Sequence, residues 1–271
     1  MTQVHVVNAD ALSTLRQIPS DCVHCVVTSP PYFGLRDYGV ANQIGLESTP
    51  QEYVAKLVEI FREVRRVLRL DGTCWLNLGD SYNNRTRIRT SSHKPIVGGD
   101  RKSWAQSARD GEIRMTITTG ALKEKDLLGI PWECASALRA HGWWLRQEII
   151  WHKPIAKLDV AADRPASTHE HLFLFSKSKN YYFDANALPA NAKGSVWSIA
   201  ATGFAGHGAA FPAALVEPCI LAGCPAGGVV LDPFAGSGTT GFVAQQLGRS
   251  GLLIELNPAY VELIKQRLNQ T

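Results

Sequence analysis

The segment LDPFAGSGTTG, residues 231–241, decides the fold class of this chain. An apolar β-branched run precedes it and a helical apolar pattern follows it, so its glycines lie in a strand-to-helix turn. Gly236 and Gly238 let the backbone turn tightly and approach a ligand without interference from a Cβ. Glu255 ends the next expected strand, where its carboxylate can accept hydrogen bonds from ribose hydroxyls. A turn of this kind is typical of open α/β sheets that bind an adenosine cofactor.

The glycine pattern alone leaves the ligand open. Gly236, Gly238 and Gly241 also satisfy the Gly-x-Gly-x-x-Gly fingerprint of nicotinamide dinucleotide sites. No Gly-Lys-Ser or Gly-Lys-Thr follows, which excludes a P-loop for nucleoside triphosphates. A turn that only packs a helix against a sheet is the alternative that needs no ligand.

Strand and helix patterns alternate along the rest of the chain. Alternating or apolar β-branched runs predict strands at 4–7, 22–28, 73–78, 143–151, 172–175, 181–183, 229–231 and 251–255. Helical spacing predicts helices from Thr49-Pro50 to Asp71-Gly72 and at 127–140, 212–222, 239–247 and 258–268. This alternation indicates an α/β fold with a mostly parallel sheet and helices on both faces, and we expect one domain over residues 1–271. The stretches 81–120 and 185–208 show no sustained period.

Composition narrows the class of protein. Hydrophobic side chains make up 45% of the 271 residues, enough for a substantial core. The formal net charge of +4 is only a weak indication of a nucleic-acid partner. The N-terminal dozen residues lack the pattern of a signal peptide, and no apolar run approaches the roughly 18 residues of a membrane span. We therefore expect a cytoplasmic protein without a membrane partner.

Six cysteines raise the question of a metal. Cys22-Val23-His24-Cys25 has the spacing of half a zinc site, but Cys219 and Cys224 are not spaced as its second half. In a cytosolic chain of this size the thiols should be reduced and mostly buried. We expect packing at the start of a strand and no bound metal.

Ser29-Pro30-Pro31-Tyr32 follows the carboxyl end of a buried strand, where α/β sheets place active sites. The exocyclic amino group of cytosine or adenine is a poor nucleophile because its lone pair is delocalised into the ring. Two acceptors aimed at its N–H bonds can free that lone pair, and a serine oxygen and a rigidly held proline carbonyl are suitable acceptors. Tyr32 offers a flat face for a base taken out of the stack. A proline-rich turn that merely ends a strand is the alternative.

These two segments together resemble the β-class DNA amino-methyltransferases, in which the catalytic motif precedes the cofactor motif. Thr28 to Tyr32 is similar to the catalytic motif, Asp232 to Thr240 to the cofactor motif, and Glu255-Leu256-Asn257-Pro258 to the ribose-binding motif. The resemblance implies a Rossmann-like methyltransferase fold, S-adenosylmethionine as cofactor, and catalysis by Ser29, Pro30, Pro31 and Tyr32. It implies a cofactor site formed by Asp10, Thr28, Phe211, Pro212, Asp232, Phe234, Ala235, Gly236, Gly238, Thr239, Thr240 and Glu255.

The resemblance also bears on the product. Members with Asp in the first catalytic position usually methylate adenine N6, and members with Ser usually methylate cytosine N4. Ser29 therefore favours cytosine N4, and adenine N6 stays open because both bases present the same amino group. Methylation at cytosine C5 needs a thiolate nucleophile, and we interpret Cys219 and Cys224 as packing residues instead.

The stretch 81–125 is the predicted target-recognition region. It holds ten Lys and Arg residues against four Asp and Glu residues, so its net charge of +6 exceeds the +4 of the whole chain. Phosphate binding would use such a surface, and Arg is the commonest reader of guanine edges. The predicted DNA-binding residues are Arg85, Arg87, Arg89, Arg101, Lys102 and Trp104. A second irregular stretch with Lys193 and Trp197 is the other candidate, and a solvated insertion is the alternative without DNA.

Double-stranded DNA is accordingly the expected partner, and a homodimer and a cognate restriction endonuclease are further partners that the resemblance suggests.

Two other classes of protein stay open. A nicotinamide-dependent oxidoreductase would use the glycine turn but leaves Ser29 to Tyr32 and the basic stretch unexplained. A DNA-binding protein without catalysis would not need an intact Ser29 to Tyr32 segment. An RNA or protein substrate is a lesser alternative.

Overall fold

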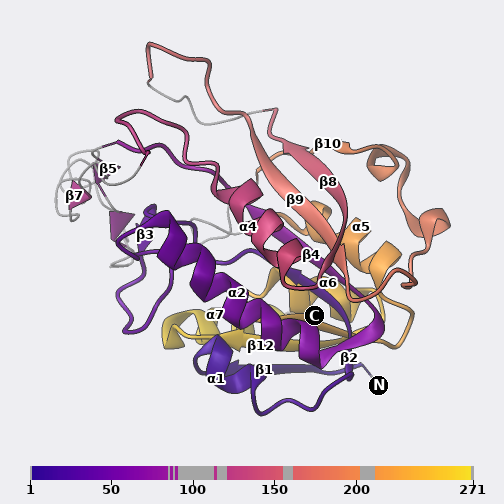
Figure 1. Ribbon diagram of the computed structural model, residues 1–271. Coiled ribbons are helices and arrows are strands. Elements are labelled where there is room, and N and C mark those ends of the chain that lie inside the picture. Colours follow the sequence, from indigo (N-terminus) through magenta and orange to yellow (C-terminus); the bar gives the residue numbers. More distant parts are fainter. Residues whose placement is uncertain are drawn as a thin grey trace, which may run out of the picture.

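The computed structural model describes residues 2–84, 121–154, 161–201 and 211–269, together with the backbone at 86–87, 89–90 and 113–114. Its centre is an eight-stranded sheet in the order β1-β12-β11-β2-β4-β9-β8-β10 (Figure 1). The strands are β1 (Val4–Asn8), β2 (Val23–Thr28), β4 (Leu68–Leu78), β8 (Trp144–His152), β9 (His169–Ser176), β10 (Val196–Ser198), β11 (Val229–Asp232) and β12 (Ser250–Glu255). Strand β9 runs antiparallel to β4 and β8, while the other pairings within this sheet are parallel. The predicted α/β fold with a mostly parallel sheet is confirmed.

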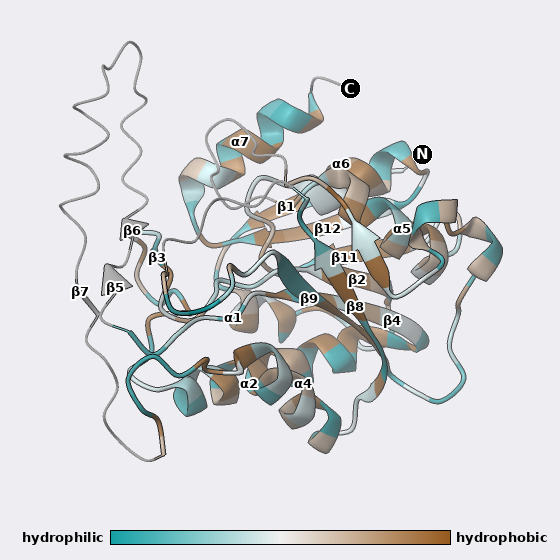
Figure 2. Cartoon of the chain, turned by 90° about the horizontal axis from the view of Figure 1, so that it is seen from above, coloured by the Kyte–Doolittle hydropathy of each residue, from teal (hydrophilic) through white to brown (hydrophobic). Residues whose placement is uncertain are grey.

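Helices cover both faces of the sheet, as Figure 2 shows from above. The helices are α1 (Ala11–Leu15), α2 (Pro50–Val67), α4 (Ile130–Ala140), α5 (Ala213–Gly223), α6 (Thr239–Gln246) and α7 (Pro258–Leu268). Helices α1, α2 and α4 lie on one face, and α5, α6 and α7 lie on the other. Each face has its own buried apolar cluster, which fixes the strands between them.

Local contacts start helix α2, and a long-range strand pairing ends it. Thr49 Oγ1 accepts from the backbone N of Glu52 at 3.2 Å, and Glu52 Oε2 accepts from the backbone N of Thr49 at 3.3 Å. This capping box and Pro50 in the first turn start the helix. The helix ends at Val67 because Leu68 adopts an extended conformation and pairs with Val23 of β2. The prediction that Asp71-Gly72 ends the helix was wrong, since these residues lie inside β4 at a register shift.

Two further sequence predictions need correction. Residues 181–183 form no strand; the Phe183 ring instead lies against Trp75, with centroids 6.4 Å apart. Residues 196–198 form strand β10 inside a stretch that was expected to be irregular. Trp197 is 2% exposed, and its indole nitrogen donates to the backbone oxygens of Ala192 and Gly194. Its predicted role in target recognition was therefore wrong, because the side chain belongs to the core.

Short strand pairs lie beyond the carboxyl end of β4, at the left of Figure 1. Strand β3 (Arg36–Asp37) pairs with β6 (Arg89–Thr90), and β5 (Thr86–Arg87) pairs with β7 (Ile113–Arg114). The backbone at Arg89–Thr90 therefore pairs with the loop that follows the Ser-Pro-Pro-Tyr segment. None of the described helices has the length and apolar content that crossing a membrane requires.

Candidate active site

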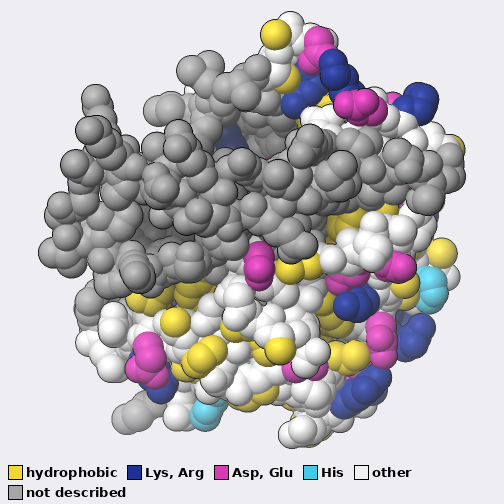
Figure 3. Space-filling view, turned by 90° about the vertical axis from the view of Figure 1, so that its left-hand side faces the viewer, with side chains coloured by type: hydrophobic (Ala, Val, Ile, Leu, Met, Phe, Trp, Pro, Cys, Tyr) yellow, Lys and Arg dark blue, Asp and Glu magenta, His cyan; other side chains and the backbone are white. Residues whose placement is uncertain are grey.

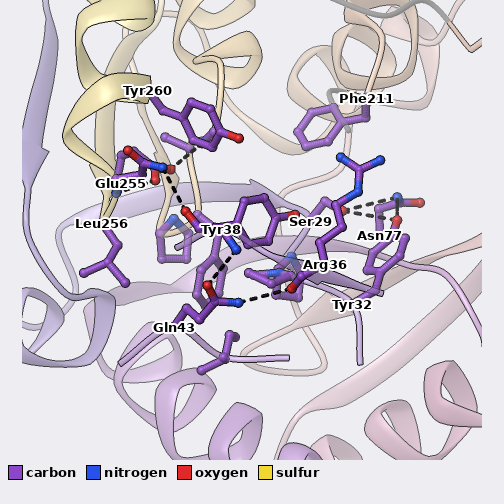
Figure 4. Close-up of a pocket in the computed structure, with 18 of the residues that line it drawn as sticks. Ser29, Tyr32, Arg36, Tyr38, Gln43, Asn77, Phe211, Glu255, Leu256 and Tyr260 are labelled. Atoms are coloured by element: carbon purple, nitrogen blue, oxygen red, sulfur yellow. Dashed lines mark hydrogen bonds between the residues drawn. The ribbon is translucent and has the colours of Figure 1, made fainter. Parts of the chain in front are cut away.

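A cavity of about 600 Å³ opens at the carboxyl ends of the parallel strands. Parallel pairing of β2 with β11 brings the Ser-Pro-Pro-Tyr segment and the glycine turn to the same edge of the sheet, although about 200 residues separate them. In Figure 4, Glu255, Leu256 and Tyr260 lie at one end of the cavity, and Ser29, Tyr32 and Asn77 lie at the other. In the space-filling view toward this edge, charged side chains cover only a small part of the surface that is not grey (Figure 3).

Glu255 organises the end formed by the glycine turn. Its Oε2 accepts from the backbone N of Gly236 at 2.7 Å, and its Oε1 accepts from the backbone N of Asn257 at 2.8 Å. Burial raises the pKa of this carboxyl to about 7, and the two backbone donors only partly oppose that rise. The carboxyl group therefore reaches the cavity wall already oriented and near the middle of its titration at neutral pH.

Asp232 lies behind the turn and does not line the cavity. Thr28 Oγ1 donates to its Oδ1 at 2.6 Å, Thr240 Oγ1 donates to its Oδ2 at 2.7 Å, and the backbone N of Phe234 donates to Oδ1 at 3.1 Å. The side chain is fully buried, and burial raises its pKa to about 6 despite these three donors. Gly238 has a φ of +76°, and a Cβ there would meet Ile264 at 2.9 Å. These contacts fix the shape of the glycine turn from the side that faces away from the cavity.

The predicted cofactor residues thus fall into two groups. Those that line the cavity are Asp10, Phe211, Phe234, Ala235, Gly236, Thr239 and Glu255. Those that lie behind the wall or beside it are Thr28, Pro212, Asp232, Gly238 and Thr240. Asp10 also caps α1, since its Oδ1 accepts from the backbone N of Ser13 at 2.8 Å.

The segment after β2 forms the opposite end. Ser29, Pro30, Pro31 and Tyr32 all line the cavity. Tyr53 of α2 donates its hydroxyl to the Pro31 carbonyl oxygen at 2.8 Å, which anchors the segment to the helix layer. Two prolines with fixed φ and an anchored carbonyl leave this segment little freedom.

Tyr32 is the centre of a group of hydrogen-bonded polar side chains. Its hydroxyl donates to Glu170 Oε2 at 2.6 Å and accepts from Asn77 Nδ2 at 2.7 Å and from Ser29 Oγ at 3.3 Å. Removal from solvent, and then the negative charge of Glu170, raise the pKa of Tyr32 well above 10. Gly79 lies against its ring, where a Cβ would come within 2.5 Å of Tyr32 Cε2.

Glu170 joins this group to a lysine from the end of β8. Lys153 Nζ forms a short ion pair with Glu170 Oε1 and lies 4.3 Å from the centroid of the Trp151 ring. The two side chains are 19% and 17% exposed and both line the cavity. Asn77 Nδ2 also donates to Glu170 Oε2 at 2.9 Å, while Asn77 Oδ1 is buried without a partner among the described residues.

Sequence reasoning missed Asn77, Trp151, Lys153 and Glu170 as site residues. One local signal existed for Asn77, a polar residue inside an otherwise apolar strand pattern. No local signal marks Glu170, because it reaches the site only through the antiparallel pairing of β9 with β4 and β8.

The predicted DNA-binding residues are only partly placed. Arg85, Arg101, Lys102 and Trp104 lie outside the described residues, and Arg87 and Arg89 are described as backbone alone. Arg89 pairs with Arg36 in the β3–β6 ladder, and Arg36 lines the cavity.

The Cys22 to Cys25 segment forms no metal site in the described part of the chain. Cys25 is buried in the core, and His24 Nδ1 accepts from the backbone N of Val229 at 3.0 Å. Among the residues that the structure describes, no three or more His, Cys, Asp and Glu side chains are grouped so that they could hold a metal.

Comparison with known proteins places the chain in a family. A family profile described as DNA methylase matches residues 23–266. The Type II methyltransferase M.XycI of Xanthomonas campestris pv. cyanopsidis is 49% identical over 267 residues, which cover 96% of this chain and 85% of that protein. The Type II methyltransferase M.SmaI of Serratia marcescens is 44% identical over 274 residues, which cover 97% of this chain and 90% of that protein.

Solved structures agree at the level of the fold. The PvuII DNA methyltransferase, titled cytosine-N4-specific, superposes with a TM-score of 0.73 at 21% identity and covers 98% of this chain and 86% of its own. A putative DNA modification methylase of Thermus thermophilus, solved with S-adenosyl-L-methionine, superposes with a TM-score of 0.67 at 24% identity and covers 100% of this chain and 94% of its own.

Proposed function

The chain belongs to the DNA methylase family of amino-methyltransferases, and from this membership we propose that it transfers a methyl group from S-adenosylmethionine to the exocyclic N4 of cytosine in double-stranded DNA. One observation carries the proposal. Ser29 and Tyr32 lie in the same cavity as the glycine turn and Glu255, so an amino group and a cofactor can meet there. The family membership removes the support for a nicotinamide-dependent oxidoreductase.

The residues at the Glu255 end fit the cofactor. An ionised carboxylate with both oxygens oriented by backbone donors suits a pair of ribose hydroxyls, and Phe234 and Phe211 give apolar surface to the remainder. When bound there, S-adenosylmethionine supplies a methyl group on a sulfonium centre. Asp10 would lie beside the bound molecule, since it lines the cavity at the same edge.

The five predicted cofactor residues that do not line the cavity are assigned a supporting role. Asp232 holds Thr28, Thr240 and the backbone of Phe234 in place, and Gly238 permits the turn that brings Gly236 to Glu255. Pro212 is the N-cap residue of α5 and directly follows Phe211, which lines the cavity. We propose that these residues shape the cofactor site and that contact with the cofactor is left to their neighbours.

The catalytic roles follow from the opposite end. Ser29 Oγ and the Pro30 carbonyl would accept from the two N–H bonds of the amino group and free its lone pair. The anchored Pro31 carbonyl keeps this segment rigid, so the acceptors need no reorganisation during the reaction. Tyr32 would hold the extruded base at its ring, which Gly79 supports.

Ser29 is the basis for cytosine over adenine. The test is methylation of plasmid DNA in cells that lack other DNA methyltransferases, followed by nucleoside mass spectrometry. We expect N4-methylcytosine from the wild type and at least about a hundredfold less from Ser29→Ala, with unchanged cofactor affinity. Finding only N6-methyladenine would overturn the choice of base and keep amino-methyl transfer. Finding neither product would overturn both.

The proposed DNA surface begins at the arginine triplet, Arg85, Arg87 and Arg89. Pairing of Arg89 with Arg36 supports it, because the backbone at Arg89 then lies beside a residue that lines the cavity. Phosphate contacts at this rim would position the duplex without reading its sequence.

The names of the relatives make a cognate restriction endonuclease a proposed partner as well, and a homodimer stays a prediction.

A further inference from the structure

Three side chains at the catalytic end form a directed line of hydrogen bonds. Ser29 Oγ donates to Tyr32 Oη at 3.3 Å, and Tyr32 Oη donates to Glu170 Oε2 at 2.6 Å. Asn77 Nδ2 donates both to Tyr32 Oη and to Glu170 Oε2, at 2.7 and 2.9 Å, and so holds these two oxygens close together. Figure 4 shows Ser29, Tyr32 and Asn77 grouped at one end of the cavity. Each hydroxyl in the line can accept at one side and donate at the other.

Methyl transfer to an amino group creates a proton that has to leave. The nitrogen lone pair forms the new N–C bond while the S–C bond breaks and sulfur keeps that electron pair. The nitrogen then carries a positive charge, the methyl group and both of its original protons. One proton must depart before the neutral methylamino product is complete. In the proposed arrangement Ser29 Oγ would accept from the amino group, but a hydroxyl can take this proton only if it gives up its own.

We propose that Ser29, Tyr32 and Glu170 form a proton relay, with Glu170 as the terminal acceptor of the proton released by the methylated amino group. The inference rests on the proposed amino-methyl transfer. The amino proton moves to Ser29 Oγ, the Ser29 proton moves to Tyr32 Oη, and the Tyr32 proton moves to Glu170 Oε2. No oxidant or further reactant is needed, and Glu170 ends as a neutral carboxylic acid.

The surroundings of Glu170 suit this role. Lys153 balances the carboxylate charge at the other oxygen, Oε1, so the resting pair has no net charge. After the transfer the Lys153 ammonium is left as a cation, and the Trp151 ring 4.3 Å away stabilises it. Both members of the pair are partly exposed, so the proton can pass from Glu170 to solvent. The raised pKa of Tyr32 keeps its hydroxyl protonated, so Tyr32 passes a proton on without holding a charge.

Glu170 contacts the Tyr32 hydroxyl directly, so a role limited to positioning Tyr32 is the competing explanation. Glu170→Gln separates the two roles because glutamine still accepts from Tyr32 through its carbonyl oxygen but is no longer basic. Tyr32→Phe keeps the ring and breaks the relay. Glu148→Gln is the matched control, since Glu148 on β8 pairs with His171 Nδ1 at 2.6 Å and does not line the cavity.

The experiment is single-turnover methylation of unmethylated plasmid DNA with enzyme in excess, alongside calorimetric binding of S-adenosylhomocysteine. Glu170→Gln and Tyr32→Phe should each lower the methylation rate at least about a hundredfold and leave S-adenosylhomocysteine affinity unchanged. Glu148→Gln should react at the wild-type rate. Glu170→Ala should regain activity when formate is added, because formate brings a carboxylate into the vacated space, and Glu170→Gln should not.

The outcomes separate the relay from the proposed function. Wild-type methylation with an equally active Glu170→Gln overturns the relay and keeps the proposed function. Wild-type methylation of adenine, with the slow variants as expected, overturns the choice of cytosine and supports the relay. A wild type that methylates no base overturns both. If Glu170→Gln does not fold because Lys153 lacks its partner, the double variant Glu170→Gln, Lys153→Met restores neutrality, and its activity decides the question in the same way.

Discussion

Replacing Asp232 by asparagine should stabilise the protein at neutral pH and leave cofactor binding intact. The carboxyl group is buried, and burial raises its pKa from an ordinary 3.8 to about 6. A carboxyl group whose pKa is higher in the folded state costs stability where it is ionised, so the cost is complete above pH 6 and disappears below about pH 4. A rise from 3.8 to about 6 corresponds to about 3 kcal/mol at pH 8 and to about half of that at pH 5.

Asparagine can keep the contacts of the carboxylate. Its Oδ1 can still accept from Thr28 Oγ1 and from the backbone N of Phe234. Its Nδ2 would then donate to Thr240 Oγ1, and Thr240 can give its own proton to the backbone oxygen of Val27, 3.1 Å away. Asp232→Asn therefore removes the buried charge without leaving a polar atom unpaired, and about 3 kcal/mol is the upper limit of the gain.

Asp232→Ala is the contrasting variant. It leaves Thr28 Oγ1 and the backbone N of Phe234 without their partner, at about 1–3 kcal/mol for each unpaired group, and it releases the glycine turn. Urea unfolding at pH 5 and pH 8, with calorimetry of S-adenosylmethionine binding, measures both effects. The asparagine variant should gain more stability at pH 8 than at pH 5 and bind cofactor as the wild type does, whereas the alanine variant should bind at least about tenfold more weakly.

Two results would refute this reasoning. Lower stability of Asp232→Asn than of the wild type at pH 8 would mean that the charge itself stabilises the turn. Equal loss of cofactor affinity in the asparagine and alanine variants would mean that the carboxylate contacts the cofactor directly.

Four further outcomes are expected. Cofactor affinity should fall about tenfold per pH unit below pH 7, because the pKa of Glu255 is about 7 and its ionised form would accept from the ribose. Calorimetric titration of the Glu255→Gln variant with cofactor at several pH values should show no such fall. Gly79→Ala should lower turnover at least about tenfold at unchanged cofactor affinity, since its Cβ would displace the Tyr32 ring, and wild-type turnover would contradict this contact. Neutralising the arginine triplet should flatten the salt dependence of DNA binding by up to about one slope unit per lost phosphate contact, and an unaltered slope would place the surface elsewhere. DNA containing 5-fluorocytosine should give no covalent adduct on denaturing gels, because transfer to nitrogen needs no thiol, and an adduct lost on replacing a cysteine would refute the mechanism.

The long, regular elements could be predicted from the sequence because their patterns are local. The capping box at Thr49 and the proline that follows it mark the start of α2, and the prediction of α7 at 258–268 is confirmed. The start of β4 could not be predicted, since Leu68 leaves the helix only because β2 offers it a pairing partner. Strand β10 has three residues, too few for an alternating pattern to appear.

The residues of the candidate site also divide into those that a local motif predicts and those that only long-range contacts bring there. Glu255 and Ser29 could be predicted because Glu255 ends a strand and Ser29 follows one, each within a recognisable motif. The interpretation of Asp232 as a direct ligand followed from its place in that motif, and only the side-chain contacts show that it faces Thr28 and Thr240 instead. Glu170 could not be predicted, because its contact with Tyr32 depends on the register of an antiparallel strand 138 residues away.

The central position of β2, between β11 and β4, has a consequence for biosynthesis. A ribosome delivers β2 and the Ser-Pro-Pro-Tyr segment early, but the partner that closes the other edge of β2 arrives about 200 residues later. Until then the nascent chain carries an unpaired strand edge, which exposes it to wrong pairing and to aggregation. The cofactor end of the cavity also depends on β12, which pairs with β1. A chain truncated before β11 and β12 would lack the partner on one edge of β2 and the cofactor end of the cavity, so it should show no methyl transfer.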